Sequence, residues 1–158
     1  MTRRYAAAAI AAFLVCLALS AGAQSGKSYK ARLSPVPMDA SMAATVSGLG
    51  SVTATLAASK LTIAGTFDGL KSPATIAQVH KAQRGIRGPA VFDLKVVVSG
   101  VSGVSGATGT SGTIGGTMDM TPQQAADLDK GWFYVQLHSE KAPDGNLWGW
   151  LVPQETRR

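Results

Sequence analysis

His80 and His138 are the only histidines in the 158-residue sequence, and they are the residues best suited to chemistry. Each closes a short run in which apolar and polar residues alternate, a pattern typical of a β-strand. Neutral imidazole binds copper and zinc well, so neighbouring strands could bring both rings to one metal ion. Two ligands do not complete such a site. The side chains that could complete it are Gln78, Asp144, Met118 and Met120.

Other roles for the two histidines remain open at this point. Each ring could form a hydrogen bond to a neighbouring turn and stabilise it. Each could instead take part in a proton-linked contact with a partner, because histidine titrates near neutral pH. Methionines at alternate positions of a strand, such as Met118 and Met120, more often fill a core than bind copper.

The run that ends at His138 and the apolar run near the C-terminus predict a β-hairpin. Alternation places Phe133, Val135 and Leu137 on the side that enters the core. Residues 143–145 read Pro-Asp-Gly, which predicts the hairpin turn. The opposite side of both strands is expected to face water and to carry aromatic rings, the side chains that dominate binding hot spots. We predict a partner-binding surface made of Tyr134, Gln136, His138, Trp148 and Trp150, with Lys81, Arg84 and Arg87 at its rim.

Short strands separated by glycine, serine, proline and aspartate must position these residues. Further strands are predicted at residues 29–33, 61–67, 95–98 and 113–120. Thr121 as N-cap, Pro122 at the first helical position and Gly131 as terminator predict one short connecting helix. The pattern favours an all-β fold, an antiparallel Greek-key-type β-sandwich.

Residues 1–23 predict a signal peptide. Arg3 and Arg4 precede an apolar stretch, and residues 21–23 offer the small side chains that signal peptidase requires before Gln24. The apolar stretch is too short for a confident membrane span. We therefore expect an exported protein, periplasmic or extracellular, with no membrane span after signal removal and a single domain over residues 24–158. Cys16, the only cysteine, would leave with the signal peptide.

Charge and motif content argue against two classes of function. Without Arg3 and Arg4, 13 basic and 9 acidic residues remain, a net charge of +4. The basic residues are scattered rather than gathered in a dense stripe, so we expect no nucleic-acid partner. The sequence contains no nucleophile elbow, and nothing indicates that its carboxylates converge, so we expect neither catalysis nor a cofactor.

Several segments together resemble a known family. In order, the matching segments are Gly65-Thr66-Phe67-Asp68-Gly69-Leu70, Val79-His80, Gly88-Pro89, Leu137-His138-Ser139 and Asp144-Gly145-Asn146-Leu147-Trp148-Gly149. Over residues 60–151 the chain resembles the CHRD domain, named after chordin and also found as a stand-alone exported domain in bacteria. The resemblance implies an extracellular or periplasmic β-sandwich without established catalysis. In chordin-like proteins, such domains belong to secreted binders of signalling proteins.

The chain departs from the family pattern at two places. Gln78 stands where the family often has a histidine, which weakens a metal site. Trp148 and Trp150 stand where the family tends to have polar residues, which indicates an altered surface. The sequence therefore predicts an exported, non-catalytic binding module that engages a protein or glycan in the cell envelope or medium. The alternative is a copper- or zinc-binding protein that uses His80 and His138.

Overall fold

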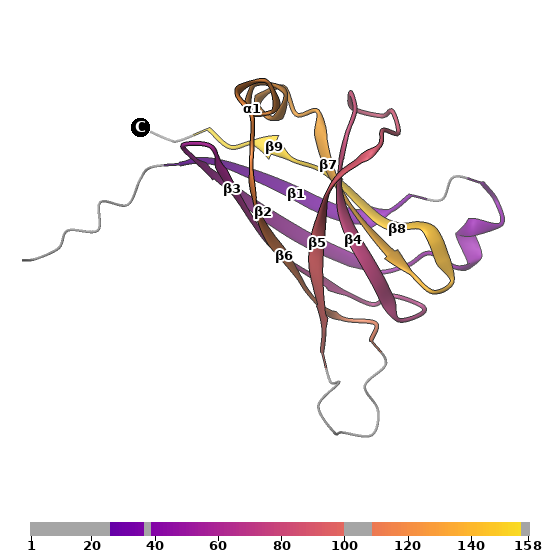
Figure 1. The fold of residues 1–158 in the computed structure, drawn as a ribbon. Coiled ribbons are helices and arrows are strands. Elements are labelled where there is room, and N and C mark those ends of the chain that lie inside the picture. Colours follow the sequence, from indigo (N-terminus) through magenta and orange to yellow (C-terminus); the bar gives the residue numbers. More distant parts are fainter. Residues whose placement is uncertain (1–25, 37–38, 100–108, 156–158) are drawn as a thin grey trace, which may run out of the picture.

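A computed structural model describes residues 26–36, 39–99 and 109–155. This part of the chain consists of antiparallel strands with one short α-helix and one turn of 3-10 helix (Figure 1). The elements are β1 (Lys27–Pro35), η1 (Met42–Ala44), β2 (Leu49–Ala57), β3 (Lys60–Asp68), β4 (Ala74–Lys81), β5 (Ala90–Val98), β6 (Gly112–Asp119), α1 (Pro122–Asp129), β7 (Phe133–Ser139), β8 (Ala142–Trp150) and β9 (Val152–Pro153). The predicted all-β antiparallel fold with one short helix is confirmed.

The strands form a closed ring. Their order is β2-β3-β6-β5-β4-β7-β8-β1, and β1 pairs again with β2, so eight strands form a closed barrel, with β9 added beside β1. β3 lies beside β6 although β4 and β5 separate them in the chain, a Greek-key order. The predicted division into two separate sheets needs correction. β5 pairs with β4 through its first half and with β6 through its second half, so the pairing is continuous.

Alternation of apolar and polar residues builds the interior of the barrel. In β3, Leu61, Ile63 and Phe67 are buried as their spacing predicts, while Thr62, Ala64 and Thr66 are exposed. The same rule holds for Phe133, Val135 and Leu137 of β7, which all belong to the interior cluster. Full burial of such a side chain stabilises the fold by about 1.5–3 kcal/mol. Because these side chains of β7 point into the barrel, only the opposite face of the β7–β8 pair can carry a surface site.

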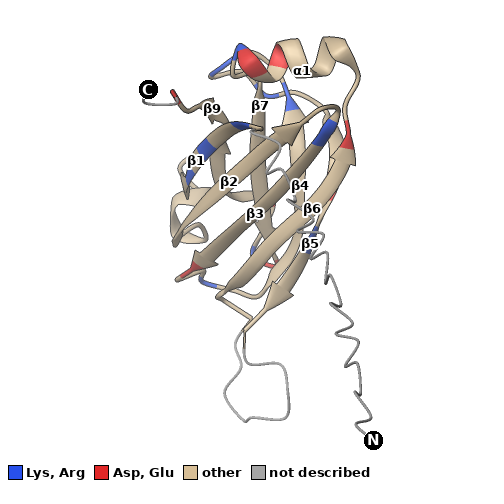
Figure 2. Cartoon of the chain, turned by 90° about the vertical axis from the view of Figure 1, so that its left-hand side faces the viewer, with Lys and Arg blue, Asp and Glu red and all other residues tan. Residues whose placement is uncertain are grey.

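α1 lies across one end of the barrel (Figures 1 and 2). Its start is the predicted one: the Thr121 side chain accepts from the Gln124 backbone N–H, and the Gln124 side chain accepts from the Thr121 N–H. Asp127 and Asp129 then attach the helix to the strands. Neither helix in the described part of the chain has the length and apolar character that crossing a membrane requires.

Candidate functional site

β7 and β8 form the predicted hairpin. Tyr134 pairs with Trp150, and Gln136 pairs with Trp148. The turn differs from the prediction: Ser139 pairs with Ala142, so residues 140–141 make the connection, and residues 143–145 lie inside β8. A shift of register between Leu137 and Ser139 accommodates this change. The proline–aspartate–glycine segment therefore lies within a strand rather than joining two strands.

The face of the hairpin opposite the core is itself buried, which contradicts the expectation that its aromatic rings face water. Tyr134 and Gln136 are 1% and 2% exposed, and Trp148 is 9% exposed. The loop between β4 and β5, residues 82–89, covers Tyr134, because its Gly88 contacts the hydroxyl of that residue. Gln136 is covered from within β8, where its side chain donates to the Asp144 carbonyl oxygen at 2.7 Å. Strand alternation separates two faces of a sheet, but it cannot show that a loop packs on one of them.

Three rings on this face form a stack. The ring centroids of His80 and Tyr134 lie 4.9 Å apart, with planes inclined by 14°. Those of Tyr134 and Trp148 lie 5.3 Å apart, with planes inclined by 10°. Trp150 packs on Tyr134 in a tilted arrangement at 4.6 Å. Aromatic pairs of this kind contribute about 0.5–1.5 kcal/mol beyond the area they bury, so the stack gives the site a rigid base.

His80 and His138 use the same ring nitrogen for a backbone contact. His80 Nδ1 lies 2.9 Å from the carbonyl oxygen of Gly88, and His138 Nδ1 lies 2.7 Å from that of Pro143. A carbonyl only accepts, so Nδ1 carries the proton in both rings and Nε2 is left with its lone pair. Both Nε2 atoms are buried and have no hydrogen-bond partner in the described structure.

Burial also affects the charge of the second histidine. It lowers the pKa of His138 below its ordinary value, and repulsion from the positive charge of Arg87 acts in the same direction. The carbonyl of Pro143 and the carboxylate of Asp144 oppose this shift without reversing it. His138 is therefore held neutral in the folded protein to a lower pH than a free histidine.

The other expected metal ligands lie elsewhere. Met118 and Met120 belong to the interior cluster, whereas His80 lies on the outer face of β4. Gln78 donates to the Asp93 carboxylate at 2.8 Å. Within the described ranges, no group of three or more histidine, cysteine, aspartate or glutamate residues is placed to hold a metal ion.

The two histidines also occupy distant places along the strands. His80 pairs with Tyr134, and His138 comes four residues later in β7. At about 3.3 Å per residue, the two backbone positions are about 13 Å apart along the strand direction. The imidazoles would have to lean toward each other to share an ion, since zinc–nitrogen bonds are about 2 Å long.

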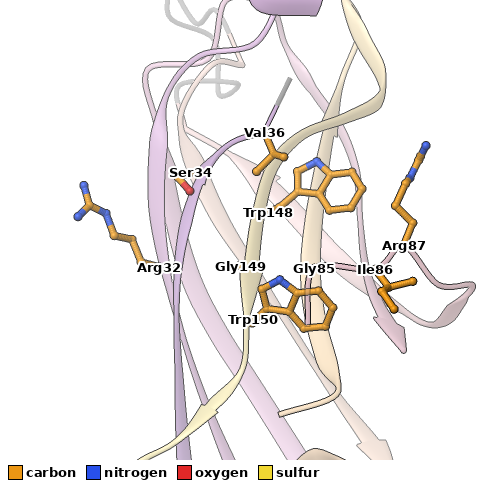
Figure 3. A pocket seen from close by; sticks show the side chains of 9 residues that line it. All are labelled: Arg32, Ser34, Val36, Gly85, Ile86, Arg87, Trp148, Gly149 and Trp150. Atoms are coloured by element: carbon orange, nitrogen blue, oxygen red, sulfur yellow. The ribbon is translucent and has the colours of Figure 1, made fainter. Parts of the chain in front are cut away.

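A groove remains open beside the stack. It has a volume of about 340 Å³ and lies where β8, β1 and the β4–β5 loop meet. We call it the tryptophan groove; its lining residues are Arg32, Ser34, Val36, Gly85, Ile86, Arg87, Trp148, Gly149 and Trp150. In Figure 3 the two indoles project from β8 one above the other, with Arg32 on one side and Arg87 on the other.

Apolar side chains in the groove remain accessible. Ile86 is 57% exposed and Val36 is 42% exposed, while Trp150 is partly exposed. The Arg87 guanidinium lies 5.4 Å from the centre of the Trp148 ring, a cation–π contact. The groove therefore combines apolar contact area with positive charge.

Of the three basic residues expected at the rim, only Arg87 lines the groove. Lys81 pairs with the Asp127 carboxylate of α1 at 2.7 Å. Arg84 lies against Gly131, just after α1. Both thus belong to the helix end of the barrel. The expected residues Tyr134, Gln136 and His138 form the buried layer beneath and beside the groove rather than its surface.

Sequence reasoning missed the contribution of β1 and the loop tip. Arg32 and Ser34 alternate outward on β1, which is visible in the sequence. What the sequence does not show is that Ser34 pairs with Trp148, which brings this strand beside β8. Ile86 also lines the groove, although no local pattern marks it as a contact residue.

Comparison with known proteins identifies one family. A family model for the CHRD domain matches residues 29–151, which includes the strands before Lys60. The comparisons find no match among curated proteins and none among solved structures.

Proposed function

This chain belongs to the CHRD domain family, and from that premise we propose that it is an exported, non-catalytic binding module. Its partner is a protein or glycan in the cell envelope or the surrounding medium. The contact is made through the tryptophan groove on the outer side of the β7–β8 hairpin, with Trp148 and Trp150 as its central rings. Predicted export of the chain through residues 1–23 provides access to such partners.

The observation that carries the proposal is the shape and lining of the groove. Its volume of about 340 Å³ falls in the range of ligand pockets, about 300–1,000 Å³. Such pockets combine apolar walls with a few polar groups that orient the ligand. Here two indoles, Ile86 and Val36 supply the apolar contact, and Arg32 and Arg87 supply the polar groups.

Rigidity of the indoles favours tight binding. Trp148 is held by its stack on Tyr134 and by Arg87, and Trp150 packs on Tyr134. A ring that is already fixed loses little conformational freedom when a partner binds. The buried layer of aromatic and polar residues thus positions the groove, and the groove makes the contact.

The test is a comparison of binding to a glycan panel and to cross-linked envelope and medium fractions of the source cells. Trp150→Ala removes a central ring and should weaken binding by about 2 kcal/mol or more, the loss typical of a hot spot. Ile86→Ser changes an exposed loop residue and should weaken binding without altering the melting temperature. Val97→Ala, exposed on β5 on another part of the barrel, is the matched control. Equal binding by all four proteins would refute the proposal.

The second candidate function is binding of copper or zinc by His80 and His138. The observation that favours it is the pair of buried, unpartnered Nε2 atoms, each on a ring oriented through Nδ1. Metal-binding histidines commonly show this arrangement. Titration with Cu⁺, Cu²⁺ and Zn²⁺ tests it: one-to-one binding lost in both His80→Ala and His138→Ala supports a shared site. Absence of binding at micromolar metal eliminates it.

A further inference from the structure

We infer that the tryptophan groove binds an acidic saccharide, a sugar that carries carboxylate or sulfate groups. The inference rests on the proposed function and names the class of ligand. A sugar ring would pack against the partly exposed indole of Trp150, beside the buried Trp148, and the acidic groups would meet the guanidinium groups of Arg32 and Arg87.

The tryptophan groove carries positive charge. Both arginines line it, and none of its nine lining residues is acidic. Neither guanidinium has an ion pair with a carboxylate in the described part of the chain. Lys30 extends the positive charge along the outward face of β1 that also carries Arg32, and Figure 2 shows basic residues on this strand. An unpaired guanidinium is a planar fork that binds carboxylate or sulfate through two parallel hydrogen bonds.

The two arginines flank the indoles of the groove (Figure 3). Arg32 and Arg87 lie on opposite sides of the groove, with both indoles between them (Figure 3). One face of a sugar ring consists of C–H groups and packs on an aromatic ring by dispersion and burial of apolar area. An acidic saccharide therefore presents an apolar face to the accessible indole of Trp150 and charged groups at its edges, where the arginines lie.

A peptide fits this site less well. β8 pairs with β7 on one side and, at Leu147 and Trp148, with β1 on the other, so a peptide cannot add as a strand beside Trp148. A helix would need a long apolar furrow, whereas this groove is about 340 Å³ and carries a guanidinium on each side. Volume, ring arrangement and charge together favour a short saccharide segment.

The experiment uses one probe in two charge states. A short oligogalacturonate and its methyl ester share the same sugar rings, and only the first carries carboxylates. Isothermal titration and the indole N–H signals of the purified protein measure binding of each, and an oligoglutamate serves as the acidic peptide. Variants are Arg32→Gln, Arg87→Gln and Trp150→Ala, with Lys95→Gln as control because it removes one exposed positive charge from β5.

The inference expects the oligogalacturonate to bind about tenfold or more tightly than its ester, since each charged hydrogen bond contributes substantially. Arg32→Gln and Arg87→Gln should each remove most of that preference, and Lys95→Gln should preserve it. Binding should also weaken as NaCl rises from about 0.05 to about 0.5 M. Melting temperatures of the variants verify that the fold is retained.

Other outcomes overturn the inference and separate it from the proposed function. If acid and ester bind equally and Trp150→Ala abolishes both, the groove is a binding site but does not select acidic sugars. If oligoglutamate binds more tightly than the saccharide, the occupant is an acidic peptide. If no saccharide binds up to about 10 mM while Trp150→Ala still loses the envelope partner, the function stands and the inference fails. If no saccharide binds and Trp150→Ala keeps the envelope partner, both the inference and the proposed function fail.

Discussion

The hydroxyl of Tyr134 contacts both backbone polar groups of Gly88. The Gly88 N–H donates to the phenol oxygen at 3.1 Å, and the phenol O–H lies 3.3 Å from the Gly88 carbonyl oxygen, to which it donates. His80 Nδ1 donates to the same carbonyl at 2.9 Å. A side chain at Gly88 would clash with the Lys81 carbonyl, so only glycine fits there. This contact attaches the β4–β5 loop to the barrel and thereby positions Ile86 and Arg87 at the groove.

Tyr134→Phe is expected to loosen the β4–β5 loop. It removes both contacts with Gly88 and leaves that partly buried N–H unpaired, which should lower the free energy of unfolding by about 1–3 kcal/mol. Hydrogen exchange should accelerate at residues 85–88, and binding at the groove should weaken. Tyr29→Phe is the control, because it also removes a hydroxyl contact, to Asp129 at 2.6 Å, but not one to the loop. Unchanged exchange in Tyr134→Phe would contradict the role of the contact.

Gly145→Ala is expected to disrupt the buried layer beside the groove. Gly145 has φ +125°, and a Cβ there would collide with Gln136 Nε2 and lie 2.7 Å from Trp148 Nε1. Overpacking of this kind costs about 1–3 kcal/mol, in addition to backbone strain. Denaturant unfolding measures the total loss.

Gly85→Ala separates the cost of backbone strain from the cost of overpacking, the two contributions expected in Gly145→Ala. Gly85 also has a positive φ, +82°, but no atom lies within 4 Å of a Cβ at that position. Its substitution should therefore cost only the backbone strain, about 1–2 kcal/mol. A Gly145→Ala loss no larger than that of Gly85→Ala would show that the packing around Gln136 and Trp148 is not tight.

His138 is expected to make the protein less stable as the pH falls through the range just below neutral. The folded-state pKa of His138 is lowered from its ordinary value of 6.5, chiefly by burial. The unfolded chain thus binds the proton first as pH falls, so this contribution is complete above pH 6.5 and is lost progressively toward the lower folded-state pKa. Unfolding measured from pH 8 to about pH 5 should show the decline. His138→Gln, which cannot gain a charge, should flatten the profile; an unchanged profile would refute the assignment.

Asp127→Asn is expected to weaken the attachment of α1. The Asp127 carboxylate is 2% exposed and meets Lys81 Nζ at 2.7 Å and Lys130 Nζ at 3.4 Å. These contacts, the one with Lys81 first, lower its pKa below 3.8, so their stabilisation is present above that pH and is lost as the pH falls further. The melting temperature of Asp127→Asn should fall at pH 7.

Asp119→Asn provides the comparison for the helix attachment. Asp119 pairs with Lys60 at 3.0 Å, but both side chains are well exposed. Exposed pairs of this kind contribute little to stability, so the melting temperature should barely change. Equal losses of melting temperature in Asp119→Asn and Asp127→Asn would mean that burial of the Asp127–Lys81 pair adds nothing to its stabilising effect.

The sequence alone determined the local elements and the interior. Alternation marked Leu61, Ile63 and Phe67 as core residues, and Thr121 with Pro122 marked the start of the helix, because side-chain period and capping depend on neighbours in the chain. The same reasoning paired the strand of Tyr134 with that of Trp150. Export of the chain and its binding function remain predictions from the sequence.

Only the tertiary structure decided what the outer face of the hairpin does. The position of Gly88 over Tyr134 and of Arg32 beside the tryptophans depends on contacts between segments far apart in the chain. The burial of Trp148 follows from these contacts and not from its own strand. Local periodicity reports the side of a strand on which a residue lies, whereas the cover over that side depends on how the whole ring of strands and its loops close.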